Sequence, residues 1–410
     1  MSSADFPTPA AVSAVQPKYL NTSALLLMAL ASGLCAGGNY FNQPLLHSIA
    51  LSLNVSETTA ALTVTMAQVS YALGLVLLVP LGDKLERRGL AVTLMLLAAT
   101  GQFISGFSVS ITMLSVGIIM AGLFSVAAQI MVPMAATLSD PARSGRAVGL
   151  VMSGLLIGIL TARSLAGLLS ELGGWTTVYR VAGVIMLLVA LTLWRLLPPS
   201  RNPAQVSYLQ VLRSMTTLIG RYPRLRSRSL MGALTFASVS VLFSTMALLL
   251  SGPNHGLSDA SIGLVGLVGI AGALMASVAG RLADKGFGVT TSIICLLLLL
   301  LAWVCFWLGS TSLMWFLVGM LVIDLALQGL HITNQSVVLQ LEPQARSRLN
   351  AVYMTSYFIG AASGSALGSL AWRLAGWHAI CIVGVVLTLL AGMVFLYDRK
   401  LARAELKSAN

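Results

Sequence analysis

The charge-free stretches of this sequence constrain its fold more than any other feature. Residues 89–139 contain no Asp, Glu, Lys or Arg. A helix that crosses a bilayer needs about 20 mostly apolar residues, so this stretch is long enough for two crossings joined by a turn near Gly106. Residues 286–323 are also free of charge and divide near Gly309 by the same reasoning. Both stretches are typical of a polytopic membrane protein.

Composition argues against a soluble globular protein and against a β-barrel. Of the 410 residues, 57% are hydrophobic and only 9% are charged, whereas an average soluble domain has about 25% charged residues. So few charges cannot solvate the surface of such a chain, and most of that surface must face lipid. Transmembrane β-strands are about 10 residues long and alternate in polarity, and these apolar segments do not alternate. The sequence therefore predicts an all-α membrane protein.

The apolar segments predict twelve transmembrane helices in two bundles of six. The first bundle, residues 22–197, has crossings at 22–46, 58–81, 89–107, 112–138, 147–170 and 176–197. The second bundle, residues 229–397, has crossings at 229–250, 260–281, 288–309, 313–340, 349–371 and 377–397. The remaining segments are expected to be cytoplasmic: an N-terminal tail at 1–21, a linker at 198–228 and a C-terminal tail at 398–410.

The basic residues predict the orientation of the chain. All Lys and Arg residues except Arg163, Arg180 and Arg373 fall on one side of these crossings. Loops rich in Lys and Arg stay on the cytoplasmic side of a bacterial inner membrane, so both termini are expected in the cytoplasm. The same placement explains the net charge of +12 by contact with anionic lipid head groups, which argues against nucleic acid as a partner.

The two bundles repeat short motifs in the same order and at a nearly constant offset, which indicates an internal duplication. The matching pairs are Gly82-Asp83-Lys84 with Ala283-Asp284-Lys285, Asp140-Pro141 with Glu342-Pro343, and Gly174-Trp175 with Gly376-Trp377. A duplication of six helices predicts two pseudo-symmetric bundles.

Two of these segments resemble a known family. The segment Pro80-Leu81-Gly82-Asp83-Lys84-Leu85-Glu86-Arg87-Arg88-Gly89 resembles the signature loop of the major facilitator superfamily, and Gly280–Lys285 resembles its second copy. In the first crossing, Asn39-Tyr40-Phe41-Asn42-Gln43-Pro44 resembles the twelve-helix branch of bacterial multidrug and sugar efflux proteins, which are drug:proton antiporters. The resemblance implies the major facilitator fold and a monomer. It also implies a central cavity, lined mainly by helices 1, 4, 7 and 10, that opens alternately to each side.

The sequence departs from the family pattern at three places. Glu86 stands where the signature loop usually has glycine, and Ile118 stands where efflux members often carry arginine. The fifth crossing lacks the Gly-Pro step that is typical of proton antiporters. The last two departures leave proton coupling and the direction of transport open.

A polar stripe on the tenth crossing is the first candidate for the transport site. Asp324, Gln328, His331 and Gln335 are spaced i, i+4, i+7 and i+11, which places them on one helical face. Ionisable side chains inside a bilayer usually face the bundle interior or water. Low-dielectric surroundings disfavour the charged form of a carboxylate, so Asp324 is a candidate proton carrier and the imidazole of His331 a second one. The alternative is a stripe that only hydrogen-bonds a neighbouring helix.

Arg163 is a second ionisable residue deep in an apolar segment, the fifth crossing. We expect it to bind an anionic group of the substrate or to balance Asp324. The alternatives are snorkelling of its side chain to the membrane surface and a purely structural ion pair.

The first crossing supplies further polar candidates. Asn39, Asn42 and Gln43 are spaced i, i+3 and i+4 and are expected to share a helical face, beside the aromatic wall of Tyr40. Gln129 in the fourth crossing matches the histidine of the stripe across the repeat. These groups either line a polar cavity or act as packing contacts. The candidate substrate-binding residues are Asn39, Tyr40, Asn42, Gln43, Gln129, Arg163, Gln328, His331 and Gln335.

The signature-loop charges are candidates for gating. Asp83 lies at a helix end, where a carboxylate can pair with Arg87 or Arg88 or cap a helix of the other bundle. The resemblance implies a latch that holds the inner gate shut, with a twin in the second copy of the loop. The alternative is a set of charges that only fixes topology. The candidate gating residues are Asp83, Lys84, Arg87, Arg88, Asp284 and Lys285.

The leading hypothesis is a secondary active transporter that exports a small organic solute in exchange for protons. An uncoupled facilitator or importer of the same fold is the alternative. An enzyme is not expected, because the four histidines are scattered, no HExxH motif is present and the four cysteines form no CxxC pair. The ATP-binding motif GxxxxGK(S/T) is also missing, and we expect neither a cofactor nor a metal.

Overall fold

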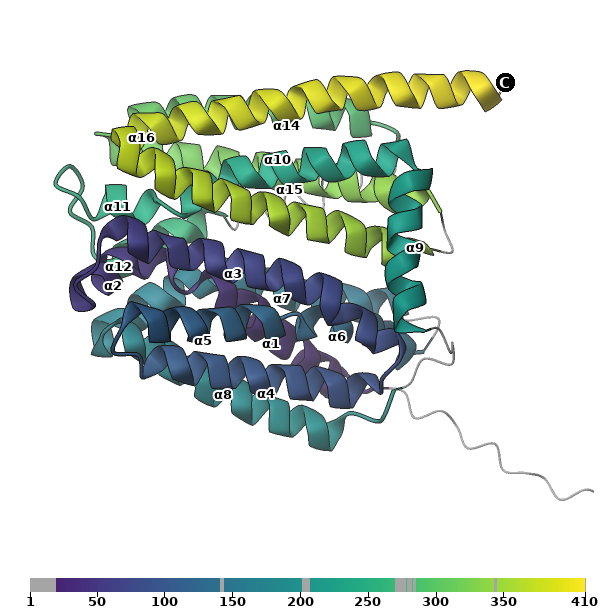
Figure 1. The fold of residues 1–410 in the computed structure, drawn as a ribbon, viewed down its shortest axis with the longest axis horizontal. Helices are drawn as coiled ribbons and strands as arrows, with labels where there is room; N and C mark the ends of the chain where they lie inside the picture. Colours follow the sequence, from purple (N-terminus) through teal and green to yellow (C-terminus); the bar gives the residue numbers. More distant parts are fainter. Residues whose placement is uncertain are drawn as a thin grey trace, which may run out of the picture.

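The helices of the protein form two sets that lie side by side. The computed structural model describes residues 20–140, 144–200, 207–269, 285–342 and 345–409, together with Val278 and Leu282. Figure 1 shows the N-terminal set, from purple to teal, below the C-terminal set, from green to yellow, with one short helix crossing the ends of both. Every regular element in the described residues is helical.

The N-terminal set contains six crossings, two of which are broken into shorter pieces. The first crossing consists of α1 (Thr22–Gly37), the 3₁₀ turns η1 (Gly38–Tyr40) and η2 (Gln43–Leu45), and α2 (Leu46–Ser52). The others are α3 (Glu57–Leu77) followed by η3 (Val79–Asp83), α4 (Arg87–Gly106), the pair α5 (Ile111–Phe124) and α6 (Ala127–Thr137), α7 (Ser144–Gly173) and α8 (Trp175–Leu196).

The C-terminal set repeats this arrangement. It contains α10 (Pro223–Phe243) with α11 (Met246–Leu250), α12 (Asp259–Val265) with η5 (Gly266–Gly269), α14 (Gly288–Leu308), α15 (Leu313–Gln340) and α16 (Arg346–Ala409). α16 holds two crossings, because its backbone turns at Ala375 and at Gly376, where φ is +64°. Glycine adopts this left-handed conformation without the strain that a Cβ atom would cause.

The prediction of twelve helices in the major facilitator arrangement is confirmed. Within the described residues, ten segments are long and apolar enough to cross a membrane. One of them, Arg348–Glu405, contains the two crossings of α16. The shorter apolar segment Asp259–Gly269 belongs to the eighth crossing. Large apolar side chains such as Leu297 and Ile382 are exposed on the outside of the bundle, where lipid would cover them.

The segment between the two sets contains a helix of its own. α9 (Tyr208–Arg221) starts with a capping box between Ser207 and Gln210, and it buries Val211, Met215 and Leu218 against the bundles. α10 then begins at Pro223, inside the interval predicted as linker. We call the end of the molecule that α9 crosses the α9 end, and the opposite end, where α2, α11 and α12 lie, the α12 end (Figure 1).

Glycine allows a close helix contact inside the N-terminal set. A methyl group on Gly158 of α7 would overlap the backbone of Gly33 in α1, so the two helices touch backbone to backbone. Contact of this kind needs small residues on both sides. It fixes α7, and therefore Arg163 one turn further along, against the first crossing.

Candidate functional site

Arg163 joins the two helix sets at the centre of the candidate site. Its Nε donates a hydrogen bond of 2.6 Å to Oε1 of Gln43 in η2. Its guanidinium carbon lies 5.0 Å from the ring centre of Tyr40 and 3.8 Å from that of Phe243 at the end of α10. Because Arg163 is only 5% exposed, these contacts replace the water that a guanidinium would otherwise keep. The snorkelling alternative does not fit a side chain that is bound in this way.

Asp324 of α15 lies on the other side of the same site. A methyl group on Gly269 of η5 would overlap the Asp324 carboxylate, and a methyl group on Gly266 would touch the aliphatic part of Arg163. Arg163 and Asp324 attract each other electrostatically, yet no ion pair within 4.0 Å joins these two described residues. The site therefore holds one buried cation from α7 and one buried anion from α15, which attract each other without a direct ion pair.

The rest of the polar stripe on α15 binds the neighbouring helix. Nδ1 of His331 is 3.1 Å from the hydroxyl of Tyr353 in α16, and Gln335 donates a bond of 2.8 Å to Oδ1 of Asn350. Gln328 is partly exposed next to Asp324. The stripe is thus divided: Asp324 faces the N-terminal set, whereas His331 and Gln335 have partners on α16.

The polar residues of the first crossing do not share one face, in contrast to the prediction. Tyr40 and Gln43 both contact Arg163, whereas Asn39 and Asn42 line a separate chamber inside the N-terminal set. The reason is local geometry, since this segment forms 3₁₀ turns. With three residues per turn, positions i and i+3 align, and positions i and i+4 do not.

A cavity opens between the two sets near the α9 end. It has a volume of about 70 Å³ and is partly open to solvent. Gln129 lines it and donates a bond of 3.2 Å to the hydroxyl of Tyr71. Arg87 and Arg348 line the same cavity, which is closed on one side by Met215 of α9.

The predicted gating residues that the structure describes lie at the α9 end. Arg87 donates to the carbonyl of Gly82 and to Oγ1 of Thr137, and Arg88 donates to the carbonyl of Leu197. Lys84 and Lys285 are exposed. The side chain of Asp83 and the whole of Asp284 lie outside the described residues, so the latch stays a prediction.

Glu86, the departure from the signature loop, has a structural role. It caps α4 by accepting bonds from the backbone N–H groups of Arg88 and Gly89, and it accepts a third from Ser200 in the segment that follows α8. Burial opposes ionisation of Glu86, but these three donors outweigh that effect and hold its pKa below the usual range. Glycine at this position would provide none of these bonds.

We expect Glu86→Gln to lower the free energy of unfolding by about 1 kcal/mol at neutral pH, which is typical for the loss of a charged helix cap. A carboxylate with a lowered pKa stabilises the fold above the ordinary glutamate pKa of 4.5, and this stabilisation fades as the pH falls through the folded-state value. The difference in Tm between the wild type and the variant should therefore shrink on acidification below 4.5. A difference that grows on acidification would contradict this role.

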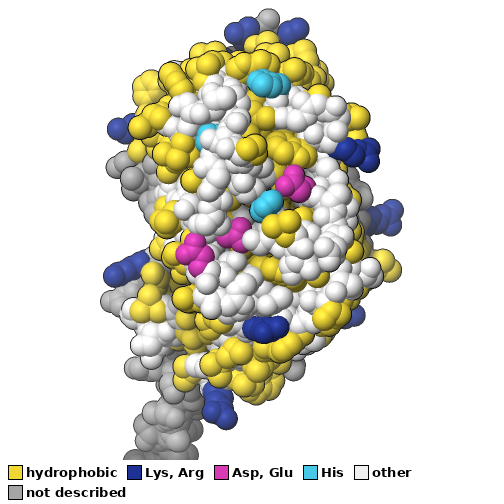
Figure 2. Space-filling view, turned by 90° about the vertical axis from the view of Figure 1, so that its left-hand side faces the viewer, with side chains coloured by type: hydrophobic (Ala, Val, Ile, Leu, Met, Phe, Trp, Pro, Cys, Tyr) yellow, Lys and Arg dark blue, Asp and Glu magenta, His cyan; other side chains and the backbone are white. Residues whose placement is uncertain are grey.

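A cluster of hydrogen bonds between the two sets closes the α12 end. Asp259, at the start of α12, accepts bonds from the hydroxyls of Ser48 in α2 and Ser170 in α7. Next to it, Ser258 donates a bond of 2.8 Å to Glu171. Figure 2 shows this end, with acidic and histidine side chains near its middle and Lys and Arg at its margin. We call the Asp259 contacts the α12 clamp; sequence analysis missed it, because Asp259 lies at the edge of a predicted crossing.

We expect Asp259→Ala to separate the two sets at the α12 end, because it removes both hydroxyl bonds of the clamp. Spin labels at the exposed positions Leu51 and Asn254 would report a longer mean distance in pulsed EPR than in the otherwise wild-type protein. Glu57→Gln is the matched control, since Glu57 binds His47 within the same set. Equal distances in all three proteins would show that the clamp does not hold this end closed.

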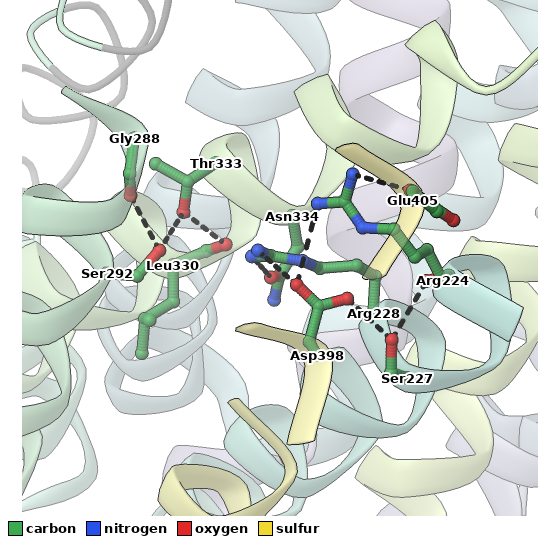
Figure 3. Close-up of polar contacts among 10 residues, drawn as sticks. All are labelled: Arg224, Ser227, Arg228, Gly288, Ser292, Leu330, Thr333, Asn334, Asp398 and Glu405. Carbon is green, nitrogen blue, oxygen red and sulfur yellow. Dashed lines mark hydrogen bonds and ion pairs between the residues drawn. The ribbon is translucent and has the colours of Figure 1, made fainter. Parts of the chain in front are cut away.

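A second network missed by sequence analysis lies in the C-terminal set near the α9 end (Figure 3). Asp398 of α16 is 0% exposed and lies 2.6 Å from Nη2 of Arg228 and 3.6 Å from Nη2 of Arg224. Ser227 donates to the same carboxylate, and Arg228 also donates to Oδ1 of Asn334 in α15. These charges were interpreted as ends of loops, and only the fold shows that they are buried together.

The described residues contain no group of three or more His, Cys, Asp or Glu side chains placed to hold a metal ion.

Comparisons with known proteins agree with this fold. A protein-family model described as the Major Facilitator Superfamily matches residues 28–342. The uncharacterized transporter YgaY of Escherichia coli O157:H7 is 49% identical over 376 residues, which cover 92% of this chain and 95% of that protein. A probable sugar efflux transporter of Helicobacter acinonychis is 25% identical over 359 residues, which cover 85% of this chain and 88% of that protein. The crystal structure of a bacterial homologue of the human lysosomal transporter Spinster, inward-facing and occupied, superposes with a TM-score of 0.73 at 16% identity, over 92% of this chain and 97% of that chain.

Proposed function

Because the chain belongs to the major facilitator superfamily, we propose that it exports a small organic solute across the bacterial cytoplasmic membrane in exchange for protons. The family makes it a transporter of small solutes and not an enzyme. The single observation that carries the finer proposal is the Arg163–Asp324 site. Helices of both sets meet there around one buried carboxyl group and one buried guanidinium group.

The orientation is the first part of the proposal. The exposed residues Lys84, Lys285 and Arg346 support placing the α9 end in the cytoplasm, because basic residues collect on that side. The α12 clamp would then face the periplasm. The closed α12 end and the cavity near the α9 end support a state that opens toward the cytoplasm.

The coupling is the second part. Deprotonated Asp324 offers two acceptor oxygens to the hydroxyl or amine groups of a solute, next to the donors of Arg163. A proton on Asp324 removes the charge that binds those groups. Proton and solute therefore compete for one carboxylate, which is the requirement for antiport. The sugar efflux relative supports a solute rich in hydroxyl groups, which would donate to this carboxylate.

A second candidate function is favoured by Arg163 itself. Its positive charge balances Asp324 without any proton, so the site can be electrically neutral in every state of the cycle. This would suit a facilitator or importer that moves its solute down a gradient, with no proton taking part.

Counterflow in proteoliposomes separates the two functions. A thermal-shift screen of the purified protein against sugars, amino acids and drugs first identifies a stabilising solute. The antiporter should then accumulate that solute against its gradient when a pH gradient is imposed, and lose this accumulation when an ionophore collapses the gradient. Exchange rates that do not respond to the pH gradient would support the facilitator and contradict the antiporter.

A further inference from the structure

The last helix, α16, continues beyond the part of the molecule that crosses the membrane. Figure 1 shows its C-terminal part running past α9, and the chain stays helical to Ala409. The predicted twelfth crossing ends at residue 397, and four of the thirteen residues that follow it are Lys or Arg. Basic residues directly beyond the cytoplasmic end of a crossing are typical of segments that bind anionic lipids. We call residues 398–409 the α16 extension.

The two acidic side chains of the α16 extension are bound to α10. Asp398 is fully buried and lies 2.6 Å from Nη2 of Arg228. Glu405 lies 3.5 Å from Nη1 of Arg224 (Figure 3). Since both arginines belong to the first turns of α10, these ion pairs fix the extension alongside that helix. They also leave the outer face of the extension basic.

The outer face of α16 changes from apolar to basic where the crossing ends. Met393, Leu396 and Tyr397 are each more than half exposed. Lys400 and Arg403 are also exposed, and they continue the same helical face at intervals of three residues. Among the described side chains, no ion pair within 4.0 Å holds either of these two cations. They are therefore available to a negatively charged group from outside the protein.

The two cations lie at the depth of the lipid head groups. At 1.5 Å per residue, Lys400 and Arg403 are about 5 and 9 Å further along the helix than Tyr397. The head-group region is about 5–7 Å thick on each side of the hydrocarbon core. Long basic side chains bend toward that level while their stems stay on apolar surface. A phosphate in this layer is thus within reach of both cations.

The face matches both parts of a phospholipid. Lysine and arginine donate charge-assisted hydrogen bonds to phosphate oxygens, and the acyl chains would pack against Leu396 and Tyr397. A soluble phosphate would use the cations alone and leave the apolar part of the face uncovered. Because the ion pairs with α10 already order the extension, binding also costs less conformational entropy than binding to a flexible tail.

We propose that this face of α16 binds an anionic phospholipid of the inner leaflet, with the phosphate on Lys400 and Arg403 and the acyl chains on Met393, Leu396 and Tyr397. The assignment to the inner leaflet follows from the proposed orientation of the α9 end. Binding of the lipid to this face depends neither on that orientation nor on the transported solute or its coupling to protons.

Native mass spectrometry of the purified full chain in a neutral detergent tests the proposal. The protein is titrated with an equimolar mixture of phosphatidylglycerol and phosphatidylcholine that carry the same acyl chains. The wild type should retain phosphatidylglycerol in preference. A cation near a membrane surface contributes about fivefold to the binding of anionic lipid, so Lys400→Gln with Arg403→Gln should weaken phosphatidylglycerol binding by more than about tenfold.

The matched control is Arg213→Gln with Arg221→Gln, which removes two exposed cations from α9 at the same end of the molecule. It should keep the preference for phosphatidylglycerol. Equal weakening in the two double variants would mean that overall charge attracts the lipid, and would overturn the proposal. A wild type without preference between the two lipids would also overturn it. So would displacement of phosphatidylglycerol by an equal concentration of glycerol phosphate, since that result identifies a site for soluble phosphate.

Discussion

Asp324→Asn abolishes proton-driven accumulation of the solute and leaves the protein folded: this is the largest functional effect that we expect. Asparagine has nearly the same size as aspartate, so it fits against Gly269 without displacing η5. It cannot take up or release a proton, and the competition between proton and solute is lost. Uphill accumulation in proteoliposomes should fall to the level of empty liposomes, whereas the monodisperse elution of the purified variant should not change.

The matched control for this variant is Glu342→Gln, an acid-to-amide change near the end of the same helix. Glu342 accepts a bond from the hydroxyl of Tyr222 and follows the C-terminal end of α15, well away from Asp324. It should keep proton-driven accumulation. If Asp324→Asn transports uphill as well as Glu342→Gln does, the proton is carried elsewhere and the assignment of Asp324 is wrong.

The second large effect concerns stability. We expect Asp398→Asn to lower the free energy of unfolding by about 3–5 kcal/mol, the range for removing one partner of a buried ion pair. Asp398 is fully buried, and its charge is shared by Arg228 and Arg224. Its loss leaves Arg228, itself buried, without a counter-charge at the contact between α10 and α16. Thermal or denaturant unfolding of the purified protein measures the change.

Glu405→Gln provides the control for Asp398→Asn, because it removes a carboxylate from the same network. Glu405 lies 3.5 Å from Arg224, but its side chain is 53% exposed. Exposed ion pairs contribute about 0–1 kcal/mol, so Tm should change little. A double variant, Arg228→Met with Asp398→Asn, should recover part of the loss by removing the uncompensated cation. Equal losses for Asp398→Asn and Glu405→Gln would mean that burial does not determine the strength of this network.

The fold was predictable from sequence because its main determinant is local. Apolar length alone identifies a crossing, and the turn between residues 89–107 and 112–138 is visible as the boundary of two such lengths. Irregular geometry was not predictable in this way. The first crossing was interpreted with α-helical spacing, which grouped Asn39 and Asn42 with Gln43, whereas 3₁₀ turns separate them.

Candidate residues were found from sequence where a polar group interrupts an apolar run. Arg163 and Asp324 stand out in this way, and the structure brings both to the contact between the sets. Asp259, Arg228 and Asp398 lie at the ends of crossings, where charges are common and carry little information. Their significance arises from partners more than a hundred positions away, such as Ser48 for Asp259 and Ser227 for Asp398.

The central claim is that the Arg163–Asp324 site reaches water from one compartment at a time. Gln328→Cys, next to Asp324 and partly exposed, tests this in a chain whose four buried cysteines are replaced. A membrane-impermeant maleimide should label this position rapidly in inside-out vesicles and slowly in right-side-out vesicles. Adding Asp259→Ala should accelerate labelling in the right-side-out vesicles. Labelling from neither side in both proteins would contradict an aqueous site between the two helix sets.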